Sequence, residues 1–149
     1  MAMEIMLFVL LVQCGSTWFM VGITWFAQIV HYPLMNCVGR DEFVIYELQN
    51  TQRTSWVVGP AILVEGLTAI AVLLRPPRGV LPFQTWVGFG LLIVIWLSTC
   101  FLQVPKHHQL TRGFDDRVHG TLVATNWIRT IAWSLRGLLA LWMVICALR

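Results

Sequence analysis

The chain has 149 residues, a formal net charge of +3 and only 11% charged residues. Its mean hydropathy of +0.73 excludes an ordinary soluble domain, and its small surplus of Lys and Arg is not that of a nucleic-acid-binding protein. We therefore expect a single membrane domain over residues 1–149, whose partner is the lipid bilayer and not nucleic acid.

Four charge-poor stretches predict the fold. Each meets the need for about 20 apolar residues to cross the hydrocarbon core of a bilayer. They cover residues 5–35, 56–74, 80–104 and 121–148. We predict an all-α fold, an antiparallel bundle of four transmembrane helices. The first stretch lacks a basic beginning and is longer than the apolar core of a signal peptide, so we expect it to remain as a membrane helix.

The stretch 5–35 carries its polar side chains on one face. At 100° per residue they fall within an arc of about 60°. They are Gln13, Thr17, Thr24, Gln28 and His31. Such residues either join neighbouring membrane helices or line a site, and both interpretations stay open. His31 is followed by Tyr32 and Pro33, and Pro33 is expected to loosen or kink the helix end.

A long connection follows at residues 36–55. Asp41 is typical of a helix start, so we expect an amphipathic helix that lies at the interface, runs into the second span and keeps its acidic residues solvated. Within that span, Glu65 lies 12 residues past Arg53, or about 18 Å of helix rise. A carboxylate at such depth is a candidate catalytic residue.

The third stretch, 80–104, also has a polar face. It carries Trp96, Thr99 and Gln103, and His107 continues it within an arc of about 80°. His107 and His108 are adjacent, so only one of them can face inward on a helix. Because His107 follows Gln103 by four residues, we choose His107.

The last stretch, 121–148, contains two arginines, each of which costs about 2.5–3.5 kcal/mol in a membrane span on insertion scales. Its polar face covers an arc of about 100°. It contains His119, Asn126, Arg129, Trp133 and Arg136. Arg129 lies nine residues past Gly120, or about 14 Å from the face near Arg53. The similar depth predicts a buried Glu65–Arg129 pair, either structural or catalytic.

An antiparallel bundle brings three histidine-bearing helix ends, those of His31, His107 and His119, to one membrane face. Histidines with a carboxylate suit iron, copper or zinc, so these three are candidate metal ligands. Glu65, Arg129 and His31 are the candidate catalytic residues. Further cofactor-binding candidates lie on the walls of the predicted cavity: Gln28, Gln103, Asn126 and Trp133. No HxxxH or ExxH spacing fixes two ligands on one helix, so the cofactor is left open between a transition metal, haem or neither.

The basic residues indicate an orientation. Arg40, Arg53, Lys106, Arg112 and Arg117 flank the histidine-rich ends. Arg75, Arg78 and Arg149 flank the other ends. The positive-inside rule then places the histidine-rich face in the cytoplasm.

Three phrases carry a resemblance. They are Trp25-Phe26-Ala27-Gln28-Ile29-Val30-His31-Tyr32-Pro33-Leu34, Gln103-Val104-Pro105-Lys106-His107 and Asn126-Trp127-Ile128-Arg129-Thr130. The chain resembles a family of small bacterial four-helix membrane proteins, which implies the bacterial inner membrane but no activity. It is also loosely similar to the anthrone-oxygenase-like membrane proteins, which oxidise polycyclic phenols. The Trp-Phe-Ala phrase is similar to a four-helix, haem-binding protoporphyrinogen oxidase, but the early histidine of that family has no counterpart in residues 5–30.

Three functional hypotheses follow. The first is a redox or oxygenase-type enzyme that uses the polar interior to bind a metal, haem or lipophilic small molecule. The second is a non-catalytic subunit of a larger photosynthetic or respiratory membrane complex, in which the polar faces only join helices. Assembly as a homo-oligomer is left open. The third is a proton or ion path.

Overall fold

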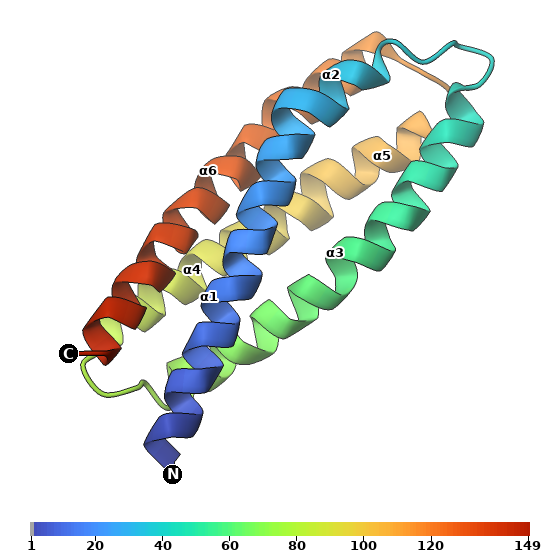
Figure 1. The fold of residues 1–149 in the computed structure, drawn as a ribbon. Helices are drawn as coiled ribbons and strands as arrows, with labels where there is room; N and C mark the ends of the chain where they lie inside the picture. Colours follow the sequence, from blue (N-terminus) through green and yellow to red (C-terminus); the bar gives the residue numbers. More distant parts are fainter. Residues whose placement is uncertain (1) are drawn as a thin grey trace.

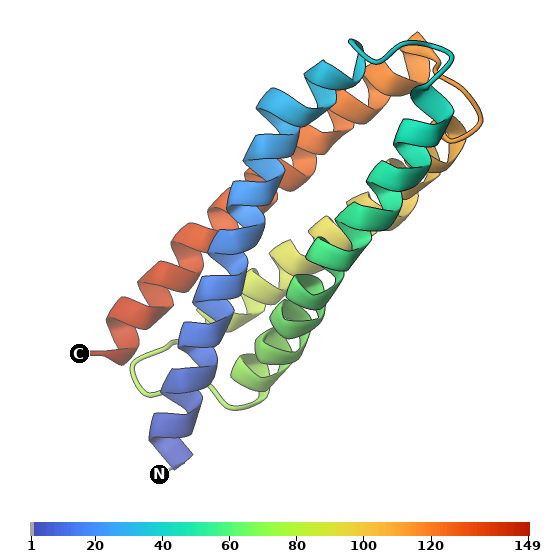
Figure 2. The same ribbon diagram turned by 45° about the vertical axis from the view of Figure 1, so that its right-hand side comes forward.

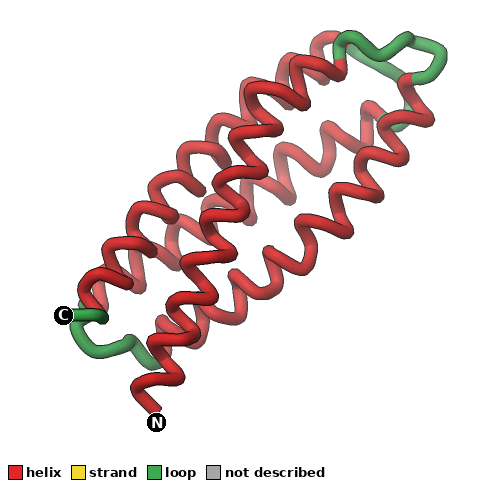
Figure 3. Tube along the Cα trace, viewed as in Figure 1, coloured by secondary structure: helices red, strands yellow, loops and turns green. Residues whose placement is uncertain are grey.

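The computed structural model describes residues 2–149, with side chains described from Glu4 onward. It confirms the predicted all-α bundle: four helical rods are long and apolar enough to cross a membrane (Figures 1 and 3). Its elements are α1 (Ala2–Phe26), η1 (Ala27–His31), α2 (Tyr32–Met35), α3 (Phe43–Leu74), α4 (Pro82–Ser98), η2 (Thr99–Gln103), α5 (Val104–Leu110) and α6 (Asp116–Ala147). The first rod comprises α1, η1 and α2, and the third comprises α4, η2 and α5.

The rods run alternately up and down. Both termini and the turn between α3 and α4 lie at one end, which we call the terminal end (Figures 1 and 2). The connections 36–42 and 111–115 lie at the opposite end, which we call the histidine-rich end. At the terminal end, Gly79 has a φ of 79°, and a Cβ there would collide with the Cys146 carbonyl group. This glycine lets the α3–α4 turn lie directly on the end of α6.

The second rod is longer than the predicted span 56–74. The predicted amphipathic helix and the span form one continuous helix of 32 residues, with Pro60 inside it. The residues Gln49, Gln52 and Arg53 are exposed on its outer face, and Trp56, 70% exposed, follows them. Because Trp favours the membrane–water boundary, we place that boundary near Trp56.

The first and third rods share a local distortion. Each contains a five-residue π-helical turn, in which Tyr32 N–H donates to the Ala27 carbonyl and Val104 N–H donates to the Thr99 carbonyl. A proline follows each turn, Pro33 in one rod and Pro105 in the other. Proline lacks an N–H and its ring collides with the carbonyl four residues earlier, so a wider turn accommodates it. The predicted effect of Pro33 is therefore a π turn, after which the helix continues to Met35.

The polar face of the first rod points inward, as predicted. Gln13, Thr17, Thr24 and Gln28 are all buried. Phe8, Phe19 and Phe26 lie on the opposite face and are 65%, 45% and 58% exposed. Hydrocarbon cannot satisfy polar side chains, so the only low-energy position for them is the interior of the bundle.

Buried side chains stack in layers between the two ends. A terminal apolar layer contains Leu10, Val72, Val80, Ala140, Met143 and Val144. A central apolar layer contains Met20, Val21, Ala69, Leu92, Ile95, Ala132 and Trp133. A cap layer at the histidine-rich end contains Tyr32, Met35, Phe43, Leu110 and Leu122. Two polar regions lie between these layers. One is an ion pair on the terminal side of Trp133, and the other is a partly polar cavity between the central apolar layer and the cap layer.

The fourth rod begins at Asp116, directly after a capping residue. Asp115 caps α6 by accepting hydrogen bonds from the N–H groups of Arg117 and Val118, at 2.8 and 3.0 Å. The bonds from Val118 and then Arg117 hold the pKa of the Asp115 carboxyl below its usual value. This cap sets the height of every later α6 residue.

Candidate functional site

A cavity of about 440 Å³ lies between the rods at the histidine-rich end. Its volume falls in the range of small-molecule sites. Its apolar part is lined by Ile23, Ala27, Val58, Gly59, Ile62 and Val104. Its polar part is lined by Thr24, His31, Tyr32, Asn50, Thr51, Thr54, Ser55, Thr99, Gln103, His107, His108, Thr111 and Arg129. The two parts together would suit a molecule with one polar end and an apolar body.

Three side chains form a hydrogen-bonded chain at this cavity, which we call the Tyr32–His107–Glu47 relay. The Nδ1 atom of His107 lies 2.6 Å from Oε1 of Glu47. The Nε2 atom of His107 lies 3.3 Å from the Tyr32 hydroxyl. Because a carboxylate only accepts, Nδ1–H is the donor, and in the neutral imidazole Nε2 then accepts from the Tyr32 hydroxyl.

Glu47 is the part of the relay that the sequence interpretation missed. We expected the acidic residues of this helix to be solvated, but Glu47 is fully buried, and Asn50 Nδ2 donates to its second oxygen at 3.0 Å. A signal for this was present. Glu47 lies one helical turn after Phe43 and therefore on the same side of the helix, which the apolar Phe43 directs inward.

His31 and Arg129 complete the polar wall. The His31 ring lies beside Asn50, with ring centroids 5.8 Å from Tyr32 and 6.4 Å from Tyr46. Arg129 reaches the cavity from α6 and interacts with the Tyr32 side chain. His31, His107 and the expected wall residue Gln103 therefore all line this cavity, and the catalytic and ligand-binding roles expected for them stay predictions.

Glu65 does not belong to this site, and its predicted pairing with Arg129 is wrong. Its carboxylate is bound by Arg136, whose Nε lies 2.5 Å from Oε1. The prediction counted depth from Arg53 and Gly120, but α3 begins at Phe43 and α6 at Asp116. Glu65 then lies about 33 Å along α3, whereas Arg129 lies about 20 Å and Arg136 about 30 Å along α6.

His119 is a structural residue, not a cavity ligand. It is 4% exposed, and its Nε2 lies 2.8 Å from the Tyr32 carbonyl oxygen. Its ring also packs on Phe114. His119 therefore ties α6 to the distorted end of the first rod, and the predicted three-histidine cluster does not form.

Gln28, Asn126 and Trp133 also lie away from the cavity lining. Asn126 Nδ2 donates to Gln28 Oε1 at 2.9 Å, and Gln28 Nε2 donates to the Val123 carbonyl at 3.2 Å. Both amides thus join the first and fourth rods. Trp133 is fully buried in the central apolar layer. None of these three expected cofactor contacts is therefore among the residues that line the cavity.

The donors present do not fit the predicted metal site. Within residues 2–149, no group of three or more His, Cys, Asp or Glu is arranged to hold a metal ion. Both ring nitrogens of His107 are engaged by Glu47 and Tyr32, and Nε2 of His119 is engaged by a backbone carbonyl.

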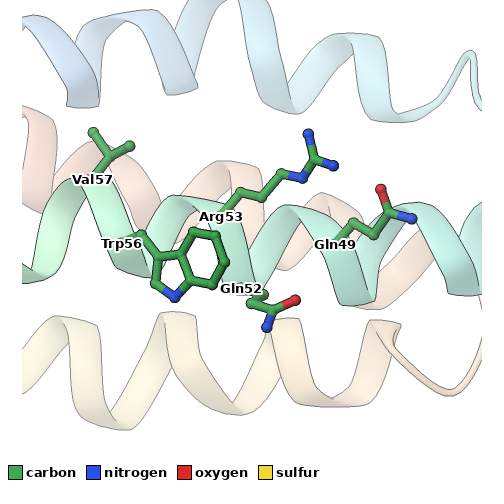
Figure 4. Close-up of a pocket in the computed structure, with 5 residues that line it drawn as sticks. All are labelled: Gln49, Gln52, Arg53, Trp56 and Val57. Atoms are coloured by element: carbon green, nitrogen blue, oxygen red, sulfur yellow. The ribbon is translucent and has the colours of Figure 1, made fainter.

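A second hollow lies on the outer face of α3. It is lined by Gln49, Gln52, Arg53, Trp56 and Val57 (Figure 4). All five residues belong to α3 and are exposed, so no second rod closes it. This hollow is therefore a surface feature of α3 at the membrane boundary.

Comparison with known proteins adds no family: no family model, curated protein or solved structure matches the chain.

Proposed function

We propose that this chain is an integral membrane enzyme that transfers protons on a lipophilic small molecule, with the Tyr32–His107–Glu47 relay as its acid–base group. The observation that carries the proposal is the contact of this relay with a cavity inside a membrane bundle. A carboxylate, an imidazole and a hydroxyl in sequence are a recurrent way to build a general base.

In the proposed mechanism Glu47 orients the imidazole and stabilises its charged form. Nδ1–H of His107 donates to Glu47, so the lone pair on Nε2 faces the Tyr32 hydroxyl. When the ligand gives a proton to the Tyr32 oxygen, the phenolic proton passes to Nε2 and an imidazolium forms beside Glu47. The reverse transfer returns a proton to the product, so the relay is unchanged after each turnover.

The resemblance to anthrone-oxygenase-like proteins suggests a substrate class for this chemistry. An anthrone carries acidic C–H bonds, and loss of one proton gives a delocalised anion that dioxygen can oxidise. The overall change is anthrone plus dioxygen to anthraquinone plus water. Dioxygen is the oxidant, and the protein supplies proton removal and a largely apolar enclosure for the rings. We therefore propose an oxygenase-type reaction on a polycyclic phenol or its keto tautomer.

The test uses purified protein in a neutral detergent with anthrone as the probe. Oxygen uptake and anthraquinone absorbance are followed, with the protein-free rate subtracted. Glu47→Gln should lower the rate by about 10²-fold or more, since general acid–base groups contribute about 10²–10⁴-fold. Tyr32→Phe and His107→Ala should lower it as well. Glu42→Gln, an exposed carboxylate on the same side of the bundle, is the matched control and should keep the wild-type rate.

Equal rates for wild type and Glu47→Gln, both above the protein-free rate, would contradict a role for the relay. A wild-type rate equal to the protein-free rate would reject anthrone as a substrate. Mass spectrometry of small molecules retained by the purified wild type and lost from Tyr32→Phe would then be needed to name another substrate.

A non-catalytic subunit of a larger membrane complex is the second candidate. It is favoured by an aromatic pair on the outer surface: Trp25 and Trp127 meet edge to face at 5.6 Å and are 42% and 39% exposed. Such rings would also suit contact with a partner helix. Purification under mild detergent decides between the two, because a subunit would be recovered with fixed amounts of other chains.

We also propose a location. The greater number of basic residues at the histidine-rich end favours the cytoplasmic face of a bacterial inner membrane for that end. The cavity would then receive its ligand from the inner leaflet or the cytoplasm.

A further inference from the structure

Two arginines on the inner face of α6 differ in their partners in the rest of the bundle. Arg129 and Arg136 are seven residues apart and therefore lie on nearly the same side of the helix. Arg136 is 2% exposed and is neutralised by Glu65. The positive charge of a buried arginine is thus compensated in this chain by a buried carboxylate.

Arg129 has no carboxylate partner among the described residues. The ion pairs found over residues 4–149 join Arg40 to Asp116, His107 to Glu47 and Arg136 to Glu65. The Nε atom of Arg129 is buried and lacks a hydrogen-bond partner in that same part of the chain. The two buried carboxylates have other partners: Glu47 is bound by His107 and Asn50, and Glu65 by Arg136.

Arg129 also faces the cavity. It lines the cavity wall from α6 and interacts with the side chain of Tyr32, the first member of the relay. An arginine whose Nε is buried without a partner and that meets no carboxylate carries a desolvation cost, and arginine binds planar anions through two parallel hydrogen bonds. A negatively charged group in the cavity would remove that cost.

We propose that the cavity binds an amphiphilic organic anion, with Arg129 holding the anionic oxygen atoms and the apolar part of the wall holding the body. The anionic head then lies near Tyr32, and the body lies against Ala27, Val58 and Ile62. This assignment rests on the cavity of the proposed function and adds the charge class of its ligand. The anion is either a free lipophilic acid or the head group of an anionic lipid.

The mouth of the cavity suits such a ligand. Some lining residues are exposed: Thr54 and Ser55 on α3, and Val104 and His108 on α5. These residues place the opening between α3 and α5, two rods that meet near the histidine-rich end (Figure 2). Trp56 marks the membrane boundary at this height on α3, so an amphiphile at the bilayer surface would have its head at the level of the opening.

The experiment measures binding and not turnover. Wild-type protein in neutral detergent is titrated with 1-decanesulfonate, which is charged at every pH, with neutral 1-decanol and with cationic decyltrimethylammonium, all at matched micellar mole fractions. We expect the sulfonate to bind and the other two probes to bind at least about tenfold more weakly. Arg129→Gln should remove this preference, and Arg129→Lys should keep part of it. Arg53→Gln, which removes the same charge from the outer face of α3, is the control and should match wild type.

Several results would overturn the proposal. They are equal binding of the three probes by wild type, unchanged sulfonate binding by Arg129→Gln, and no binding of the sulfonate at all. Thermal unfolding without probe gives an independent check, because removing a partly buried cation that meets no carboxylate should leave the protein at least as stable as wild type. A large loss of stability in Arg129→Gln would show that the charge is compensated inside the protein, and would also overturn the proposal.

A second arm separates the two sources of the anion. In nanodiscs, phosphatidylglycerol should compete with the sulfonate in wild type if a lipid head group is the natural ligand, and phosphatidylcholine should not. If a free acid is the ligand, both nanodiscs should give the same sulfonate affinity. The outcome is separable from that of the relay: an Arg129-dependent charge preference with no effect of Glu47→Gln on any reaction would retain the anion site and reject the proposed acid–base chemistry.

Discussion

Glu65 and Arg136 form a buried ion pair that connects all four membrane rods. Nε of Arg136 in α6 donates to Glu65 in α3 over 2.5 Å, and Nη1 donates to the Gly88 carbonyl in α4. Ser16 and Thr17 in α1 donate to the same carboxylate at 2.9 and 2.8 Å. Both charges are removed from solvent, so each depends on the other.

We predict that Glu65→Gln and Arg136→Gln each lower the free energy of unfolding by about 3–5 kcal/mol, because each leaves one buried charge without its partner. The double variant should lose less than the sum. Unfolding in mixed detergent micelles measures the three values. Strict additivity would contradict the pair, and a cycle of Glu65→Gln with Arg129→Gln should show little coupling.

Gly66 and Gly90 form a matched pair of glycine substitutions. A Cβ on Gly66 would lie 3.0 Å from the Trp96 ring, whereas a Cβ on Gly90 would meet nothing within 4 Å. Gly66→Ala should therefore destabilise the bundle by about 1–3 kcal/mol through overpacking. Gly90→Ala should stabilise it by about 0.5–1 kcal/mol through helix propensity. The same unfolding assay checks both, and a stabilising Gly66→Ala would refute the close contact of α3 with α4.

Pro105 holds the π turn that presents His107 to Glu47. Pro105→Ala restores an N–H that can bond to the Phe101 carbonyl, so the extra residue is no longer required in the turn. If the π turn becomes a regular α-helical turn, every residue of α5 is rotated by about 100° relative to α4. The downfield proton NMR signal of the His107 Nδ1–H···Glu47 bond should then disappear. Pro76→Ala, in the exposed α3–α4 turn, should leave it in place; an unchanged signal in Pro105→Ala would show that the π turn does not need proline.

The proposed orientation can be tested with a native thiol. Cys37 is exposed in the connection after α2, at the histidine-rich end. A membrane-impermeant maleimide should leave Cys37 unlabelled in intact spheroplasts and label it in inverted inner-membrane vesicles. A Cys37→Ser variant identifies the signal. Labelling in spheroplasts would place the histidine-rich end outside the cytoplasm.

The sequence predicts well which side chains of a helix face the interior, but predicts poorly which residues of neighbouring helices lie at the same depth. The inward faces of Thr17, Gln28 and Gln103 follow from 100° per residue and from the cost of polar groups in hydrocarbon. The partner of Glu65 depends on where α3 and α6 begin. A search for charge-poor stretches misses the start of α3. The first turns of this helix carry polar and charged residues on the outer face and bury the residues of the inner face.

The relay could be predicted only in part, for a related reason. His107 was found because it continues a polar face, whereas Glu47 lies in a segment whose other acidic residues, Asp41 and Glu42, are exposed. His119 escapes the pattern because its partner is the backbone carbonyl of Tyr32, and no side-chain pattern reveals which carbonyl groups the last turn of a helix leaves free. The π turns also shift the helical phase in a way that uniform spacing cannot show.

The central apolar layer has an electrical consequence. Met20, Leu92, Ile95 and Trp133 are almost fully buried between the cavity and the Glu65–Arg136 pair, so an apolar barrier separates the relay from the terminal end. In the proposed function, the protons that the relay would release or take up are then exchanged with the water on one face alone. Such turnover moves no charge across the bilayer, and its rate should be insensitive to the membrane voltage that the cell maintains.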